Sequence, residues 1–167
     1  MMVSISVERP GQRDGVLALN RLAFEGDDEA RIIEALTRDG LVVLSLVASD
    51  DDQVIGHILF SRLEVEMERR AIRAVALAPM AVHPDQQGKG IGSALVRRSL
   101  DLLAAHGVEA VLVVGHTGFY PRFGFSAALT RQIAGPFQGL EAFMGLELRA
   151  GALSGQGICR YPAAFGL

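Results

Sequence analysis

The chain has 167 residues, a formal net charge of −3 at pH 7 and one cysteine. A chain of this length buries about two-thirds of its unfolded surface around one core, so we expect a single domain over residues 1–167. The acidic balance excludes nucleic acid as the main partner, because phosphate binding needs a concentrated basic face. The lone Cys159 cannot form an internal disulfide, which suits a reducing compartment.

The sequence gives no sign of a signal peptide or a membrane partner. Glu8, Arg9 and Asp14 interrupt the start of the chain, where a signal peptide is apolar. Every apolar run is shorter than the ~20 residues of a transmembrane helix. Histidine and cysteine residues do not cluster at the spacing of metal ligands, so we expect no metal. These features predict a cytoplasmic protein.

Apolar periodicity predicts most elements of the N-terminal half. Alternating apolar residues indicate strands, and apolar residues three and four apart indicate helices. β-Branched and aliphatic runs strengthen the assignment of strands. In chain order the predicted elements are a strand at 3–8, helices at 16–24 and 28–39, and adjacent antiparallel strands at 41–48 and 54–66.

The second half begins with an apolar strand at 72–82 that contains Pro79. Proline has no N–H for a strand ladder, so it marks a sheet edge or a bulge. A helix is predicted at 90–106, and the wholly apolar run at 110–114 is typical of a strand buried on both faces. Strand, crossover helix and strand form a right-handed unit with parallel strands. One further strand is expected within 141–149, and the whole predicts one mixed α/β domain.

A glycine-rich turn joins this strand to the helix. Residues 82–92 read Val-His-Pro-Asp-Gln-Gln-Gly-Lys-Gly-Ile-Gly. Glycines let an anion approach backbone N–H groups where a helix begins and its dipole favours negative charge. Two nucleotide-binding patterns fail on spacing: Walker A lacks its Ser or Thr after Lys89, and GxGxxG finds Ser93 or Leu95 where its last glycine belongs. Residues 87–92 fit the pattern QxxGxG.

Between a strand and a helix, this pattern resembles the acetyl-CoA motif of the GNAT superfamily of N-acetyltransferases. Residues 120–125, Tyr-Pro-Arg-Phe-Gly-Phe, resemble the family's YxxxGF motif and stand at the family's spacing. Further segments resemble a bacterial subgroup of uncharacterised predicted acetyltransferases, so the likeness covers almost the whole chain: Leu22-Ala23-Phe24, Gly56-His57-Ile58-Leu59-Phe60, Phe143-Met144 and Arg160-Tyr161-Pro162. The resemblance implies an α/β (α+β) fold with a mostly antiparallel sheet and a parallel, splayed central strand pair, flanked by helices.

The resemblance also implies that acetyl-CoA is the acyl donor. Its pyrophosphate is expected on the backbone of the turn. Its pantetheine arm is expected on the strand that Pro79 interrupts, where an N–H would stabilise the oxyanion of the reaction. A solvated role for Lys89 and an ordinary strand-edge role for Pro79 stay open. The expected cofactor-binding residues are Met80, Ala81, Val82, Gln87, Gly88, Lys89, Gly90, Ile91, Gly92 and Ser93.

Tyr120 is the expected catalytic residue. A phenol with a pKa near ~10 stays protonated at neutral pH and can protonate the coenzyme A thiolate as it leaves, with packing as the alternative role. The general base stays open, because residues 71–82, where some relatives carry a glutamate, contain no acidic residue. A water chain or an amine that arrives neutral would serve as well as a side chain. The candidate side chains are His116, Glu141, His57 and Glu25.

The expected reaction is direct attack of a primary amine, on a small molecule or a peptide, on the acetyl-CoA thioester. Phe24, Glu25 and Phe143 are candidates for the acceptor pocket, with a core role as the alternative for the aromatic residues. Two other functions stay open: an acyl-CoA sensor without turnover, which the presence of Tyr120 disfavours, and an interaction domain without cofactor. The resemblance is compatible with a homodimer, and the sequence does not set the oligomeric state.

Overall fold

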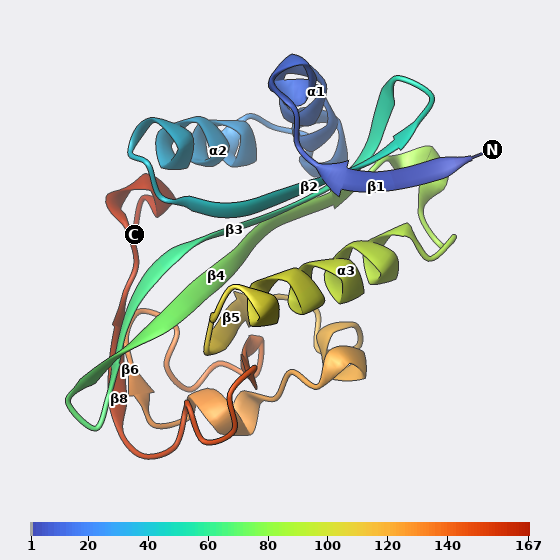
Figure 1. Ribbon diagram of the computed structural model, residues 1–167. Coiled ribbons are helices and arrows are strands. Elements are labelled where there is room, and N and C mark those ends of the chain that lie inside the picture. Colours follow the sequence, from blue (N-terminus) through green and yellow to red (C-terminus); the bar gives the residue numbers. More distant parts are fainter. Residues whose placement is uncertain (1) are drawn as a thin grey trace. The chain divides into compact units, whose positions relative to one another are not determined.

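The computed structural model describes residues 2–167 (Figure 1). Among these residues, no helix is long and apolar enough to cross a membrane. The helices are α1 (Arg13–Phe24), α2 (Asp28–Arg38) and α3 (Ile91–Ala105). The strands are β1 (Val3–Val7), β2 (Val42–Asp50), β3 (Gln53–Met67), β4 (Arg70–Val82), β5 (Ala110–Val114), β6 (Ile133–Ala134), β7 (Phe143–Glu147) and β8 (Gly157–Arg160).

The chain divides into two compact units. The first contains the residues up to Ser61 and Ala78–Ser99, and the second contains Arg62–Leu77 and Leu100–Leu167. In the first unit β2 pairs antiparallel with both β1 and β3. Both helices that follow β1 bury apolar side chains, which lie on one side of each helix and therefore pack into the core. These side chains are Val16, Leu17 and Leu19 of α1, and Ala30, Ile33 and Leu36 of α2.

The start of α3 packs closely against β3 at Gly56. A Cβ atom at this position would lie 2.9 Å from Ile91 Cγ2 and 3.1 Å from both Ala48 Cβ and Leu95 Cδ1. A side chain here would push the helix away, because a close-packed interior has no space to accept it. Gly56 therefore lets the first turn of α3 approach the sheet.

A chain of buried polar groups connects α1 to the strands of the first unit. Asn20 Nδ2 donates to Val16 O at 2.9 Å and approaches His57 Nδ1 at 3.2 Å, and His57 Nε2 lies 3.1 Å from Ser45 Oγ. Ser45 Oγ donates to Glu8 Oε1 at 2.7 Å. Since Asn20 donates to Nδ1, the imidazole proton is on Nε2, which donates to Ser45. Each hydrogen bond between these side chains is therefore donated in the direction from Asn20 of α1 towards Glu8.

Arg13 extends this series to α2. Its Nε lies 2.6 Å from Glu8 Oε2, and its Nη1 donates to Thr37 Oγ1 at 2.7 Å. Burial raises the pKa of Glu8, but hydrogen bonds from Arg13 and Ser45 and the Arg13 charge outweigh it and hold that pKa below its usual value. Burial lowers the pKa of His57 to about 4, so its ring is neutral at pH 7. We call this series, from Asn20 to Thr37, the polar chain.

The second unit holds the parallel strand pair. Residues 74–77 of β4 pair parallel with residues 110–113 of β5, and β7 pairs antiparallel with β5 on its other side. β8 pairs antiparallel with β3 and parallel with the two-residue β6. Glu68 and Arg69, both with positive φ, form the tight turn between β3 and β4. The largest fully buried side chains of this core are Leu63, Leu103, Leu112 and Phe143.

The predicted fold class is confirmed: the sheet is mixed and mostly antiparallel, and the pair β4 and β5 is parallel. Pro79 does not mark a sheet edge, because β4 has β3 and β5 as neighbours. Instead, the pairing of β4 with β5 ends at Leu77, and β4 continues to Val82. The strand expected within 141–149 is β7, and the prediction missed β6 and β8.

The close contact at Gly56 generates a stability prediction. We expect Gly56→Ala to lower the free energy of unfolding by about 1–3 kcal/mol, because the new methyl group overlaps Ile91 and Leu95. Urea unfolding measures the change. Gly11→Ala is the matched control, because a Cβ there meets no atom within 4 Å. Equal stability of the two variants would contradict the packing argument.

The neutral His57 generates a prediction about pH. Its pKa is about 4 in the fold, against 6.5 for an ordinary histidine, so the unfolded chain binds more protons between these values. Stability therefore falls as the pH falls through this window, by about 2 kcal/mol between pH 7 and pH 5. Urea unfolding at both pH values measures the loss, and NMR titration of the His57 ring follows the same group directly.

His57→Gln should flatten this slope, whereas His116→Gln, at an exposed histidine, should keep it. A His57 ring that takes up its proton near pH 6.5 in the folded protein would refute the explanation.

Candidate functional site

The glycine-rich turn lies in the first unit, between β4 and α3, and its own side chains shape it. His83 Nδ1 accepts a hydrogen bond from Asp85 N at 3.1 Å, at the start of a short 3-10 turn. Gln87 Nε2 reaches back to Val82 O at 3.2 Å. Lys89 Nζ donates to Gln86 Oε1 at 3.2 Å. The glutamine that begins the QxxGxG pattern therefore ties the turn to the end of β4.

Two glycines of the turn are required by backbone conformation. Gly88 has φ +76° and Gly90 has φ +84°, both in the left-handed region that side chains disfavour. A Cβ at either position would meet nothing within 4 Å, so the space beside them is open. The turn thus presents backbone to solvent.

The first turn of α3 offers backbone donors to a ligand. Ala94 N donates to Gly90 O at 3.0 Å, which is the first hydrogen bond of the helix. The N–H groups of Ile91, Gly92 and Ser93 precede it and have no acceptor inside the helix. No other acceptor for them occurs within residues 2–167. Together with the helix dipole, these donors favour an anion such as a phosphate group.

The segment Met80–Val82 continues β4 into the turn. Ala81 is buried, and its neighbours Met80 and Val82 are half-buried. His83 N donates to Ile55 O at 2.8 Å, which holds this end of the strand against β3. The peptide bond between Ala78 and Pro79 is cis. All ten residues expected to bind the cofactor therefore lie in the first unit, on one continuous strand, turn and helix.

Tyr120 lies in the second unit, at the start of a 3-10 turn that follows β5. Its ring is 6% exposed and makes edge-to-face contacts with Phe119, at 5.0 Å between centroids, and with Phe125, at 5.6 Å. A Cβ at Gly115 would collide with the same ring, at Cε2 and Cδ2. Gly115 is thus needed for the place of the tyrosine. The sequence pattern alone does not show this need, because it depends on the ring of Tyr120 folding back over the strand end.

The Tyr120 hydroxyl has no hydrogen-bond partner among residues 2–167, although the residue is almost fully buried. Among the described side chains, the buried polar atoms without a partner are Asn20 Oδ1, Ser61 Oγ and Ser99 Oγ. The Tyr120 hydroxyl is not one of them, so it is not completely sealed from solvent. Burial of the ring raises the pKa of Tyr120 to about 12, so the phenol is protonated at neutral pH.

The structure separates the candidates for the general base. His57 is fully buried in the polar chain and cannot meet a substrate. His116 and Glu141 are exposed. Glu25 is exposed too, and its left-handed backbone ends α1. The burial of His57 excludes it, the positions of the other three do not distinguish them, and the general base stays open.

The order Ser45, His57 and Asn20 also resembles a nucleophile with its base, but the hydrogen bonds run in the wrong direction. Asn20 donates to Nδ1, so Nε2 holds the proton that a base would need to accept. The Ser45 hydroxyl donates to Glu8 instead. This arrangement holds elements in place and does not activate Ser45.

The structure places the two aromatic candidates for the acceptor pocket in different surroundings. Phe143 is fully buried in the core of the second unit, so it has the core role and does not line an open pocket. Phe24 is 42% exposed at the end of α1.

Burial raises the pKa of the Cys159 thiol to about 11, which leaves it protonated and unreactive. Within the described residues, no three His, Cys, Asp or Glu side chains gather as metal ligands.

Comparison with known proteins finds relatives along nearly the whole chain. The model of the acetyltransferase (GNAT) family matches residues 16–125. The chain is 38% identical over 164 residues to the uncharacterized N-acetyltransferase YhbS of Escherichia coli K12, covering 96% of this chain and 97% of that protein.

Solved structures agree with these matches. The crystal structure of E. coli YhbS in complex with CoA matches with a TM-score of 0.89 and 36% identity, over 99% of this chain and 92% of that one. A GNAT acetyltransferase from Brucella melitensis in complex with acetyl-CoA matches with a TM-score of 0.81 and 32% identity, over 98% of both chains. Since strand, glycine-rich turn, helix and Tyr120 all lie inside the matched region, the chain belongs to the acetyltransferase (GNAT) family of acyltransferases.

Proposed function

We propose that this chain transfers an acetyl group from acetyl-CoA to a primary amine of a small molecule or a peptide. The amine attacks the thioester directly. The observation that carries the proposal is the start of α3, where three backbone N–H groups without acceptors follow a turn held open by Gly88 and Gly90. Similar proteins solved with CoA and with acetyl-CoA support the same donor here.

The donor-binding residues of the proposal form one continuous segment. The N–H groups of residues 87–93 hold the pyrophosphate, and Lys89 adds positive charge beside it. Residues 80–82 hold the pantetheine arm, since the pairing of β4 with β5 stops at Leu77 and leaves backbone groups beyond it for another partner. A backbone N–H of this segment stabilises the oxyanion that forms on attack.

Tyr120 donates its proton to the departing thiolate in the proposed reaction. Its hydroxyl without a partner among residues 2–167 and its raised pKa of about 12 support this role, because the phenol keeps its proton at every pH near neutrality. Gly115, Phe119 and Phe125 hold the ring. Acetyl-CoA supplies an activated acyl group, so the chain needs to add only orientation, oxyanion stabilisation and this proton.

The two compact units form a single acetyltransferase domain in this proposal. Three elements run through both units, namely β3, β4 and α3. The proposed location is the cytoplasm, which the free thiol of the buried Cys159 supports. The acceptor is an amine in this proposal, and the exposed Glu25 beside the end of α1 is suited to attract it while it is cationic.

An amine panel tests the proposed function. The protein is incubated with acetyl-CoA and with primary amines and short peptides, and free thiol and acetylated product are measured. We expect thiol release with at least one amine, matched by an equal amount of amide product. Saturable CoA binding without thiol release from any amine would favour an acyl-CoA sensor instead. CoA binding should also stabilise the fold, by about 2.7 kcal/mol at a CoA concentration about 100 times its Kd. Absence of any thermal shift with CoA would refute the donor assignment.

Tyr120→Phe tests the proton donor, because it removes the hydroxyl and keeps the ring. We expect kcat to fall about 100-fold or more, with little change in the KM for acetyl-CoA, since general acid catalysis is lost and donor contacts are not. Tyr161→Phe is the matched control, because Tyr161 is the other tyrosine of the chain and packs between Phe137 and Phe165. Full kcat in Tyr120→Phe would overturn the assigned role.

A further inference from the structure

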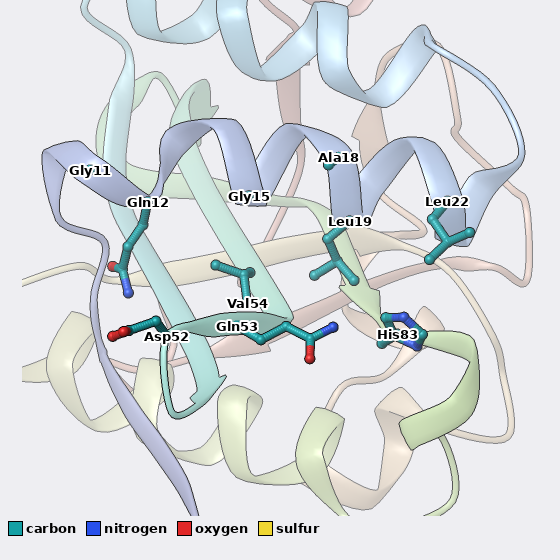
Figure 2. A pocket seen from close by; sticks show the side chains of 10 residues that line it. All are labelled: Gly11, Gln12, Gly15, Ala18, Leu19, Leu22, Asp52, Gln53, Val54 and His83. Carbon is teal, nitrogen blue, oxygen red and sulfur yellow. The ribbon is translucent and has the colours of Figure 1, made fainter.

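The first unit contains a pocket that the donor site does not use. It has a volume of about 390 Å³ and lies between α1, the turn from β2 to β3, and the end of β4 (Figure 2). The pocket shares His83 with the glycine-rich turn, but none of the proposed donor-binding residues 80–82 and 87–93 lines it. It therefore lies beside the donor loop and is formed by other side chains.

Apolar side chains form its long walls. Leu19 and Leu22 project from α1, and Val54 faces them from β3 (Figure 2). α1 comes close to the strand at Gly15, where a Cβ would lie only 2.9 Å from Val54 Cγ2. The walls thus suit a narrow hydrocarbon segment, and burial of each methylene there favours binding.

The only charge in the lining of the pocket described is negative, and it belongs to Asp52. Asp52 is the single charged side chain among the lining residues described, and Figure 2 shows it near Gln12, at the opposite end from His83. Gln12 Oε1 accepts from Arg9 N at 2.8 Å. The carboxylate of Asp52 has no ion pair with any side chain in residues 2–167. A cation is therefore favoured at this end, and an anion is repelled.

At the other end, His83 offers a hydrogen-bond donor. Its Nδ1 accepts from Asp85 N, so the ring N–H is on Nε2. In Figure 2 the ring lies beyond Gln53, on the side of Leu22. The pocket thus has a carboxylate at one end, an N–H donor at the other and hydrocarbon between them.

We propose that this pocket is a second small-ligand site, and that it takes an ammonium ion carrying a short alkyl chain. The ammonium group pairs with Asp52, and the chain lies along Leu19, Leu22 and Val54. The ammonium ion contacts none of the proposed donor-binding residues and not Tyr120, so its binding can be measured without an acyl donor.

NMR of the methyl groups tests the site in the full-length protein without an acyl donor. Hexylammonium chloride is titrated, and 1-hexanol and sodium hexanoate, with the same chain length, serve as uncharged and anionic probes. We expect saturable shifts at Val54, Leu19 and Leu22 with hexylammonium, at least threefold weaker affinity for hexanol, and the weakest for hexanoate. Butylammonium should bind more weakly than hexylammonium, by about fourfold for each methylene that is buried.

Two substitutions in the same turn distinguish binding to the carboxylate of the pocket from attraction by the negative charge of the turn in general. Asp52→Asn should weaken hexylammonium binding at least threefold and leave hexanol binding unchanged. Asp51 carries the same charge next to Asp52 but lies outside the pocket. Its φ of +53° is tolerated by asparagine, so the Asp51→Asn protein should bind hexylammonium normally. Absent or scattered methyl shifts, equal affinity for the three hexyl probes, or equal effects of the two substitutions would each overturn the proposal. CoA binding, measured on the same samples, shows separately whether the donor site is intact.

Discussion

The contact between α3 and β3 at Gly56 is the constraint on which the donor site depends. The useful groups of that site are backbone N–H groups, and backbone cannot move by changing a rotamer. Their position is fixed only if the whole first turn of the helix is fixed, and Ile91 and Leu95 fix it by packing where Gly56 has no side chain. The open conformation of Gly88 and Gly90 then brings the chain from β4 to this helix with its donors uncovered. Close packing of α3 against β3 thus holds the helix in place while its first N–H groups stay exposed to a ligand.

The polar chain imposes a different kind of order on the same unit. Hydrophobic packing between a helix and a sheet tolerates small shifts, whereas hydrogen bonds between 2.6 and 3.2 Å fix direction as well as distance. Such a series is costly when it is incomplete, because each buried polar group loses its water. Asn20 Oδ1 is left without a partner, yet the remaining members tie α1, α2, strands β2 and β3 and the residue that follows β1 to one arrangement. α1, which also walls the proposed ammonium pocket, is therefore held by directional bonds.

Local patterns in the sequence predicted the elements that are long and periodic. The helix α3 and the buried strand β5 follow from apolar spacing, and the turn between β4 and α3 follows from its glycines. β6 and β8 were missed because two and four residues show no period, and their pairing depends on contacts distant in sequence. For the same reason the role of Gly56 could not be predicted, because it is set by Ile91 and Leu95, which lie far along the chain. Gly115 is close to Tyr120 in sequence, but the local pattern does not show that the ring folds back over it.

His83 contributes both to the turn that leads into the donor loop and to the lining of the proposed ammonium pocket. Its backbone N–H closes the end of β4, its Nδ1 caps the turn that leads into the donor loop, and the rest of its ring lines the separate pocket. A ligand that rotates this ring would break the bond from Asp85 and disturb the turn. By thermodynamic linkage, any such effect on CoA affinity must be matched by an equal effect of CoA on the ligand. Heterotropic coupling between the pocket and the donor loop, if a ligand produces it, would pass through this one imidazole.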